Sequence, residues 1–174
     1  MGKPGKRRWR TPPLAVACGA ALTVAVGCSA PAAGSAGGNA PDPAHAKNGT
    51  AITVDAHSLP GIGTVLVTDK DYALYMFQPD NHRAVTCTGA CAGTWPPLML
   101  PDGAALVAGP GVKQSLLSSA PDPAGGRVVT YAGWPLYAYT GDTGPDQATG
   151  EDIDLNGGEW YVMRVCGQPL EPAL

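Results

Sequence analysis

Two cysteines four residues apart are the side chains of this sequence whose type and spacing most directly suggest chemistry. Cys87 and Cys91 lie in the segment 86–98, which reads TCTGACAGTWPPL. If this segment is helical or turn-like, the two Cα atoms lie about 6 Å apart, which is within reach of a disulfide. A local disulfide would hold down the rigid, apolar segment Trp95-Pro96-Pro97. Because thiolates favour Cu(I), the alternative is a copper-binding or electron-transfer site in which His82 joins the two cysteines.

A second set of candidate ligands lies near the C-terminus. Asp152, Asp154 and Asn156, followed by Gly157, repeat the opening of a calcium-binding loop, with oxygen ligands at alternate positions and a glycine for the turn. The Glu expected at the twelfth position of such a loop is replaced by Met163. Asn-Gly-Gly is also an ordinary hairpin turn between two strands. We favour the turn, with a weak Ca²⁺ site as the alternative.

Two aspartates occupy equivalent places in an internal repeat. Shifted by 62 residues, VLVTDKDYALYMFQPD (65–80) aligns with RVVTYAGWPLYAYTGD (127–142). Each copy is expected to form a β-hairpin, and Asp80 or Asp142 then accepts backbone N–H groups in the turn that follows. The two carboxylates could instead serve a hydrolase. Because the chain has no Gly-x-Ser-x-Gly, His-Glu-x-x-His or phosphate-loop motif, we do not expect an enzyme.

The elements that would position these residues predict an all-β fold with little helix. Short β-forming runs bounded by Gly, Pro, Asp or Asn recur at residues 64–68, 72–77, 127–132, 135–140 and 159–165. The best helical candidate is 112–119. We expect a small single domain built from two repeated hairpin units, with these bounds: domain 51–167, first repeat about 62–100, second repeat about 125–165, tail 168–174.

The first hairpin is apolar on both faces. Alternation along the strand places Leu74 and Met76 on one face and Tyr75 and Phe77 on the other. We therefore expect this hairpin to lie between two layers rather than at the surface. The many Tyr and Trp residues either form the core or line a site for a sugar, quinone or haem, and we favour the core because the chain has a single Phe.

The first 27 residues predict an export signal. A basic start is followed by an apolar run, residues 14–27, that is shorter than the ~20 residues of a membrane span. Small residues directly precede Cys28, as in a bacterial lipoprotein signal, so Cys28 is the expected lipidation site. Ala25 stands where Leu is usual, so a secretory signal with an incidental cysteine stays an alternative. Residues 28–50 form an Ala/Gly/Pro-rich flexible linker, and the acyl chains would hold the protein at the extracytoplasmic face of the cell membrane.

Removal of the signal leaves an acidic chain. Five of the eleven Lys and Arg residues lie within the first 27 residues, so the remainder carries six basic against fourteen acidic residues, a formal charge of −8. Such a charge argues against a nucleic-acid partner. Export also places the remaining cysteines in an oxidising compartment.

The cysteine count alone leaves the disulfide pairing open. With Cys28 lipidated, Cys87, Cys91 and Cys166 remain, and three cysteines cannot all pair within one chain. A Cys87–Cys91 bridge would contribute only ~2 kcal/mol in the chain-entropy model, whereas a bridge to Cys166 would contribute ~4.5 kcal/mol. A catalytic redox pair is disfavoured because no cation lies beside either Cys87 or Cys91 to lower its pKa.

The sequence resembles a known family through a motif of the form Tyr-x-(Phe/Trp/Tyr)-x-x-Asp. The motif occurs twice, and the resemblance extends to the segment that contains Trp95; the motif residues are Tyr75, Phe77, Asp80, Tyr137, Tyr139 and Asp142. It is similar to the predicted bacterial lipoproteins named for this motif, also called the secreted repeat family of unknown function. The resemblance implies an exported, usually lipid-anchored protein, common in high-GC actinobacteria and proteobacteria, with no established activity. It favours the Cys87–Cys91 disulfide and leaves Cys166 free, buried or cross-linked to another chain.

These observations together predict an exported, lipid-anchored protein of the cell envelope. We expect a binding or scaffolding module whose partners are the membrane, through the anchor, and an envelope protein or small ligand. No resident cofactor is expected, with copper or Ca²⁺ as the alternatives. A copper or electron-transfer protein and, last, a hydrolase are the competing functions.

Overall fold

The computed structural model describes residues 51–82 and 84–170. The expected signal peptide, the lipidation site Cys28, the linker and the end of the tail lie outside these residues. The described residues form a β-rich unit with only short helices, which confirms the all-β fold class. No helix in this part of the chain is long and apolar enough to span a membrane.

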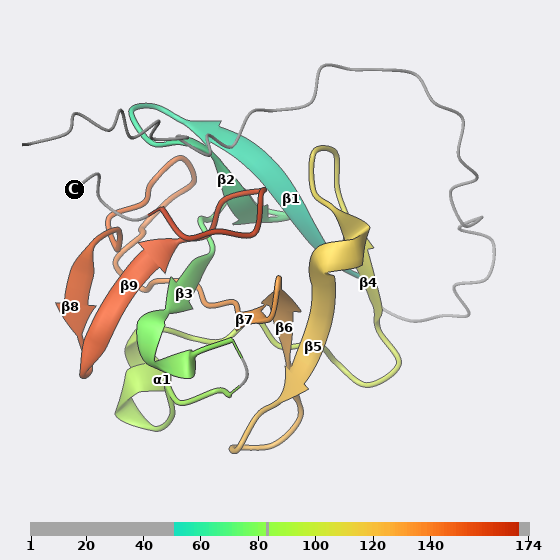
Figure 1. Cartoon of the computed structure of the whole chain (residues 1–174), viewed down its shortest axis with the longest axis vertical. Coiled ribbons are helices and arrows are strands. Elements are labelled where there is room, and N and C mark those ends of the chain that lie inside the picture. The colour runs from blue at the N-terminus through green and yellow to red at the C-terminus, as the bar shows by residue number, and fades with distance from the viewer. Residues whose placement is uncertain (1–50, 83, 171–174) are drawn as a thin grey trace, which may run out of the picture. The chain divides into compact units, whose positions relative to one another are not determined.

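Three small sheets carry the fold (Figure 1). Their strand orders are β2-β1-β4, β3-β9-β8 and β5-β6-β7. The strands are β1 (Ala51–Leu59), β2 (Gly63–Thr68), β3 (Tyr75–Phe77), β4 (Ala105–Ala108), β5 (Leu117–Pro121), β6 (Arg127–Tyr131), β7 (Trp134–Pro135), β8 (Ile153–Leu155) and β9 (Gly158–Val162). The helical elements are the 3₁₀ turns η2 (Gln78–Asp80) and η3 (Gln114–Leu116) and the single α-helix turn α1 (Ala90–Thr94).

The expected helix at residues 112–119 is wrong. Only η3 is helical there, and the next five residues form β5, which pairs antiparallel with β6 from Leu117↔Tyr131 to Pro121↔Arg127. A short helical pattern gains little by itself, and strand pairing overrides it. The β1–β2 hairpin is the counterpart of β5–β6 in the first repeat, so each repeat has one more strand than its sequence pattern shows.

The two faces of the central strands pack into two separate cores. One buried cluster contains the odd-numbered residues of these strands, Val65, Val67, Tyr75 and Phe77. A second buried cluster contains even-numbered residues, among them Leu66, Leu74 and Met76. The expectation that the first hairpin lies between two layers is therefore confirmed. It follows that the three central side chains of β2 and all those of β3 are buried.

The segment Trp95-Pro96-Pro97 is a strand-like element of the first repeat. Pro97 bridges to Tyr137 in the second repeat, just as Val162 in β9 pairs with Tyr75 in β3. Trp95 therefore takes the place in its repeat that Trp160 takes in the other, two residues before the paired position. Its indole is fully buried.

Cys87 and Cys91 form a disulfide, which confirms the local disulfide expected from the sequence. Their Cα atoms lie 5.2 Å apart, and the bridge joins the segment before α1, which contains Cys87, to Cys91 within α1. Cys87 is buried in the same cluster as Trp95. Cys166 is also disulfide-bonded, so the free thiol considered for it is wrong.

The turn between β8 and β9 is a tight hairpin. Leu155 pairs with Gly158, so Asn156 and Gly157 alone form the loop, with φ of 60° and 89°. Positive φ at both central residues is the type I′ geometry that Asn-Gly favours. The segment therefore forms the turn that the sequence favours.

Candidate functional site

The two repeats meet at the first tyrosine of each motif. Tyr75 and Tyr137 exchange backbone hydrogen bonds across an antiparallel bridge, with N···O distances of 2.8 and 2.9 Å. Two residues that exchange both bonds lie on a local twofold axis of the backbone pairing. Equivalent residues of the two motifs are thus brought face to face.

Each tyrosine hydroxyl reaches the aspartate of the opposite repeat. Tyr75 Oη donates to Asp142 Oδ2 at 2.6 Å, and Tyr137 Oη donates to Asp80 Oδ2 at 2.6 Å. Both bonds are buried, and hydrogen bonds to a carboxylate are about twice as strong as neutral ones. The first and last residues of the motif therefore act together, but across the two copies of the motif and not within one copy.

The second oxygen of each carboxylate is held within its own repeat. Asp80 Oδ1 accepts the backbone N–H of Thr86 at 2.8 Å and its hydroxyl at 2.6 Å. Asp142 Oδ1 accepts the same two groups of Thr149 at the same distances. These backbone bonds close the turn after each motif strand, which is the role expected for an aspartate at that position.

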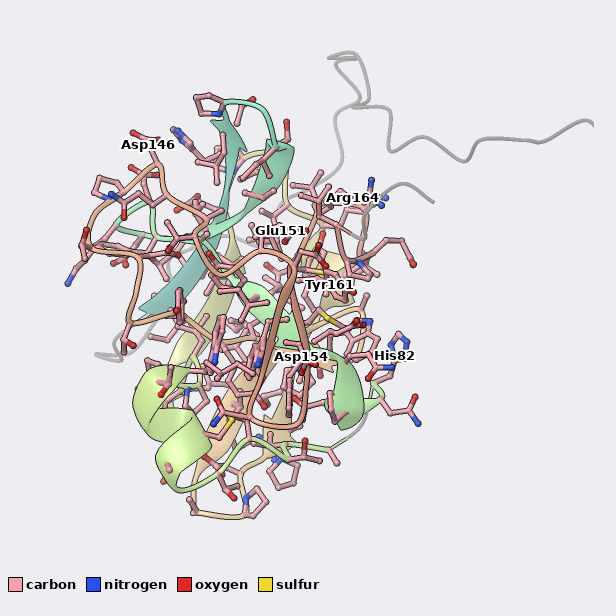
Figure 2. All side chains as sticks on the ribbon, turned by 90° about the vertical axis from the view of Figure 1, so that its left-hand side faces the viewer. His82, Asp146, Glu151, Asp154, Tyr161 and Arg164 are labelled. Atoms are coloured by element: carbon pink, nitrogen blue, oxygen red, sulfur yellow. A yellow bond between two sulfur atoms is a disulfide. The ribbon has the colours of Figure 1, made fainter. Side chains whose placement is uncertain are left out.

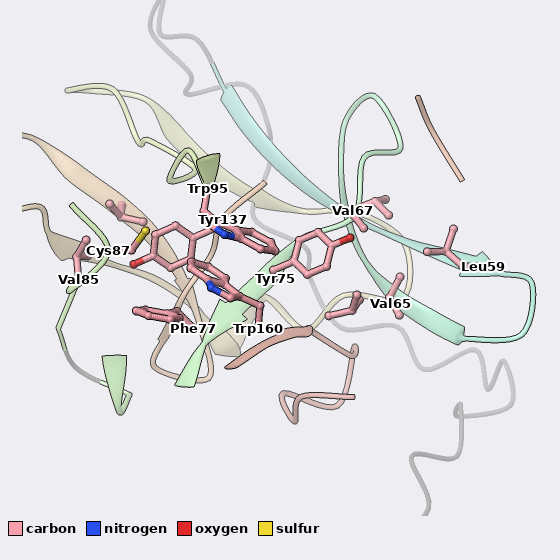
Figure 3. Close-up of a cluster of buried hydrophobic side chains, with 13 residues drawn as sticks. Leu59, Val65, Val67, Tyr75, Phe77, Val85, Cys87, Trp95, Tyr137 and Trp160 are labelled. Carbon is pink, nitrogen blue, oxygen red and sulfur yellow. The ribbon is translucent and has the colours of Figure 1, made fainter. Parts of the chain in front are cut away.

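The aromatic residues form a column of four stacked rings through the interface, and Figure 3 shows three of them, Phe77, Trp160 and Trp95. Trp95 and Trp160 stack at a centroid distance of 3.9 Å and an interplanar angle of 2°. Tyr139 stacks on the outer face of Trp95 at 4.1 Å, and Phe77 on the outer face of Trp160 at 4.3 Å. The third position of each motif thus supplies one end of the column.

The motif tyrosines close the column from the side. Tyr75 meets Trp95 edge-on at 5.3 Å, and Tyr137 meets Trp160 edge-on at 5.2 Å. Stacked and edge-to-face pairs contribute about 0.5–1.5 kcal/mol each beyond burial. Every motif residue therefore has a structural partner in the interface.

Burial shifts the ionisation of these groups. Burial raises the pKa of both Tyr75 and Tyr137 above the ordinary range, and the carboxylate that each hydroxyl contacts raises it further. Burial also raises the pKa of Asp80, although its bonds from Thr86 and Tyr137 oppose that rise. Both phenols consequently remain protonated donors at neutral pH.

This arrangement leaves the motif little capacity for catalysis by its carboxylates. Asp80 and Asp142 are 1% and 5% exposed, and all four carboxylate oxygens accept hydrogen bonds from within the domain. A general acid or base must reach the atom whose proton it moves. The geometry thus provides no support for the hydrolase interpretation.

The proposed metal ligands do not come together in a ligand cluster. In residues 51–82 and 84–170 no group of three or more His, Cys, Asp or Glu side chains is placed to hold a metal ion. Cys87 and Cys91 are bonded to each other, and the His82 ring lies against Trp134 at 3.9 Å with Nδ1 3.4 Å from the Ala132 carbonyl. Asp152, Asp154 and Asn156 belong to the β8–β9 hairpin and the turn before it.

Glu151 is a half-buried acid that the sequence analysis did not single out. Its Oε2 accepts the backbone N–H of Val162 at 2.6 Å, beside the strand that pairs with Tyr75. Burial raises the pKa of Glu151 to about 7; the Asp152 charge adds to this rise, and the Val162 bond and the Arg164 charge oppose it. Figure 2 labels Glu151 and Arg164 on this side of the domain.

The threonines and the second tryptophan were also missed. Each has a sequence signal: a Thr follows each motif aspartate after six or seven residues, as Thr86 and Thr149, and a Trp follows further on, as Trp95 and Trp160. The different loop lengths after Asp80 and Asp142 hide this second half of the repeat from a comparison at one fixed shift.

Removing one motif hydroxyl is expected to destabilise the domain. Tyr75→Phe leaves a buried Asp142 oxygen without its donor, so we expect the free energy of unfolding to fall by about 1–3 kcal/mol. Tyr137→Phe should cost a similar amount, by the same geometry. Urea denaturation of the purified domain measures both losses.

The matched control is Tyr139→Phe, which keeps its ring in the column; within the described residues the Tyr139 hydroxyl makes no hydrogen bond. We expect this change to stay within about 0.5 kcal/mol of the unmodified protein. Equal losses for Tyr75→Phe and Tyr139→Phe would show that the cross-repeat bond contributes no stability.

Glu151 makes stability depend on pH between about 4.5 and 7. The folded state binds this proton more tightly than the unfolded chain does, so the stabilisation is complete at low pH and is lost as pH rises through about 7. Glu151→Gln keeps an oxygen for the Val162 N–H and removes the titration.

Thermal unfolding across this pH range, with the exposed Glu159→Gln as control, measures the effect. We expect the pH dependence to weaken in Glu151→Gln and to persist in the control. An unchanged profile in Glu151→Gln would contradict the assignment.

Comparison with known proteins gives one family and no individual relative. A family model described as a secreted repeat of unknown function matches residues 60–99 and 118–164. Searches of the curated proteins and of the solved structures found no match. The two matched ranges contain both motifs and both tryptophans of the column. Because the matched residues amount to half of the chain, the protein belongs to the family of secreted repeats of unknown function.

Proposed function

We propose that this protein is a lipid-anchored component of the bacterial cell envelope whose folded domain is a rigid binding or scaffolding module. The observation that carries the proposal is the complete use of the motif inside the domain. Both carboxylates, both first tyrosines and both tryptophans contact one another across the repeats. A motif used in this way specifies a stable platform and leaves recognition to the surface.

Export is supported by the family and by the disulfide. The matching family is described as secreted, and the Cys87–Cys91 disulfide suits an oxidising compartment. Attachment to the membrane is supported by the basic start, the apolar run and the small residues before Cys28. Two or three acyl chains, at about 0.8 kcal/mol per buried CH₂, would anchor the chain without a membrane span.

The copper interpretation has less support. Its two sulfur ligands, Cys87 and Cys91, are joined in a disulfide and would first have to be reduced to act as thiolates. The hydrolase interpretation also has less support, because the carboxylates of Asp80 and Asp142 are both buried. Binding or scaffolding therefore remains the function that the geometry supports best.

Anchoring predicts that Cys28→Ser prevents acylation. Expressed in an actinobacterial host with an alkyne-labelled fatty acid, the unmodified chain should carry the label and sediment with membranes. Cys28→Ser should lose the label and move to the soluble fraction or the medium. Cys18→Ser, which changes a cysteine within the apolar run, is the control and should keep the label. Labelling that survives Cys28→Ser would contradict the anchor.

The binding role has a separate test in living cells. A photo-crosslinking amino acid at Leu155, which is 39% exposed on β8, samples the surface of the second repeat. We expect one discrete adduct with an envelope component that depends on Cys28. Diffuse labelling that is identical in the anchored and Cys28→Ser chains would contradict a binding module.

A further inference from the structure

We propose that the stacked rings and the two tyrosine–aspartate pairs form a site of one-electron oxidation that holds an oxidising equivalent as a buried tyrosyl radical. This activity goes beyond binding or scaffolding and does not depend on it. The substrates are a one-electron oxidant, such as an oxidising radical at the cell surface, and a one-electron reductant, such as a hydroquinone.

The rings in this interface are nearly all oxidisable. Of the six rings, only Phe77 lacks an oxidisable heteroatom; the others are Tyr75, Trp95, Tyr137, Tyr139 and Trp160. A core that needed only volume would be served by Phe or Leu, which carry no polar atom to satisfy. The chain contains one Phe against six Tyr and four Trp residues.

The column gives an electron a continuous path. Tyr139 is half-buried and forms the end nearest solvent, and it stacks on Trp95, which stacks on Trp160. Aromatic rings in van der Waals contact have overlapping π systems, so an oxidant at this end of the column can take an electron from Trp95, and the electron vacancy is then shared with Trp160. Phe77 ends the column on the far side and keeps the vacancy on the two indoles.

The vacancy does not settle on the indoles because they have no base. Trp95 Nε1 is buried without a hydrogen-bond partner, and Trp160 Nε1 donates to the Leu155 carbonyl at 3.0 Å. A carbonyl does not take a proton from an oxidised indole at neutral pH. An oxidised tryptophan in this column therefore stays a cation, which favours its reduction by a neighbouring group that can release a proton.

Tyr75 and Tyr137 are such groups. Each lies edge-on to one indole and donates a 2.6 Å hydrogen bond to a carboxylate. Tyr75 passes one electron to oxidised Trp95, and its phenol proton moves along the hydrogen bond to Asp142 Oδ2. The electron ends on the external oxidant, the proton ends on Asp142, and Tyr75 becomes a neutral radical. A reductant later returns the electron, and Asp142 returns the proton to Oη.

The same geometry explains why the proton acceptor is needed. Burial raises the pKa of both phenols, so neither is deprotonated beforehand. Without an acceptor in contact, oxidation would leave a charged phenol in an apolar core, which is costly. With the carboxylate in contact, the phenol proton neutralises it. Each tyrosine–aspartate pair then changes from one negative charge to no charge, and no charged phenol is left in the core.

Flash photolysis of the purified protein with a ruthenium tris(bipyridine) sensitiser and a cobalt(III) acceptor tests the proposal. We expect a tryptophan radical cation that decays into a neutral tyrosyl radical, seen by transient absorption and by electron paramagnetic resonance after freezing. In the double variant Tyr75→Phe and Tyr137→Phe, the long-lived tyrosyl signal should be lost and the tryptophan radical should persist. The control Tyr72→Phe, outside the column, should behave as the unmodified protein.

The unmodified protein supplies a readout that requires no variant to fold. Ring-deuterated tyrosine should narrow the radical spectrum, ring-deuterated tryptophan should not, and D₂O should slow the decay of the tryptophan radical. A radical that remains on tryptophan in the unmodified protein would overturn the proposal. The proposal also fails if the signal is lost in Tyr72→Phe but kept in the double variant.

Discussion

Two buried carboxylates are the constraint on which the rest of this structure depends. An isolated ionised carboxylate in a protein interior is strongly destabilising unless hydrogen bonds satisfy its oxygens. In both Asp80 and Asp142, one carboxylate oxygen accepts hydrogen bonds from a threonine of the same repeat. The other oxygen accepts a hydrogen bond from a tyrosine of the opposite repeat. Neither repeat can satisfy its aspartate alone, so each requires the other for burial.

The backbone bridge and the ring column follow from this requirement. The Tyr75–Tyr137 exchange fixes the strand register, and a slip of one residue would direct both hydroxyls into the other core. With the register fixed, the third motif position falls on the outer face of a tryptophan in each repeat. The backbone at Gly150 packs directly against the column. A side chain could not be placed there, because a Cβ on Gly150 would lie 2.6 Å from the Trp95 ring.

Sequence reasoning could predict what depends on neighbouring residues. Alternation predicted the two faces of β3, and the spacing of Cys87 and Cys91 together with the family resemblance predicted their disulfide. The exchange between repeats could not be predicted, since an aspartate that caps its own turn explains the same pattern. The equivalence of Trp95 and Trp160 was hidden because their loops differ in length. Strand β4 was missed because pairing with the distant strand β1, not local propensity, creates it. Strand β5 was missed because its pairing with the neighbouring β6 overrides a short helical pattern.

The two halves differ in the loops that follow the two motif aspartates. After Asp80 the chain is short and is stabilised by α1 and the disulfide, whereas after Asp142 it is longer and contains Glu151. Both loops must still deliver a threonine to the carboxylate and a tryptophan to the column. A second protein that carries the same motif would therefore share this interface and its oxidisable rings without necessarily sharing a surface ligand. Differences in binding are expected in these two loops, whereas the chemistry of the column is expected to be common to every chain that keeps both tyrosines, both aspartates and both tryptophans.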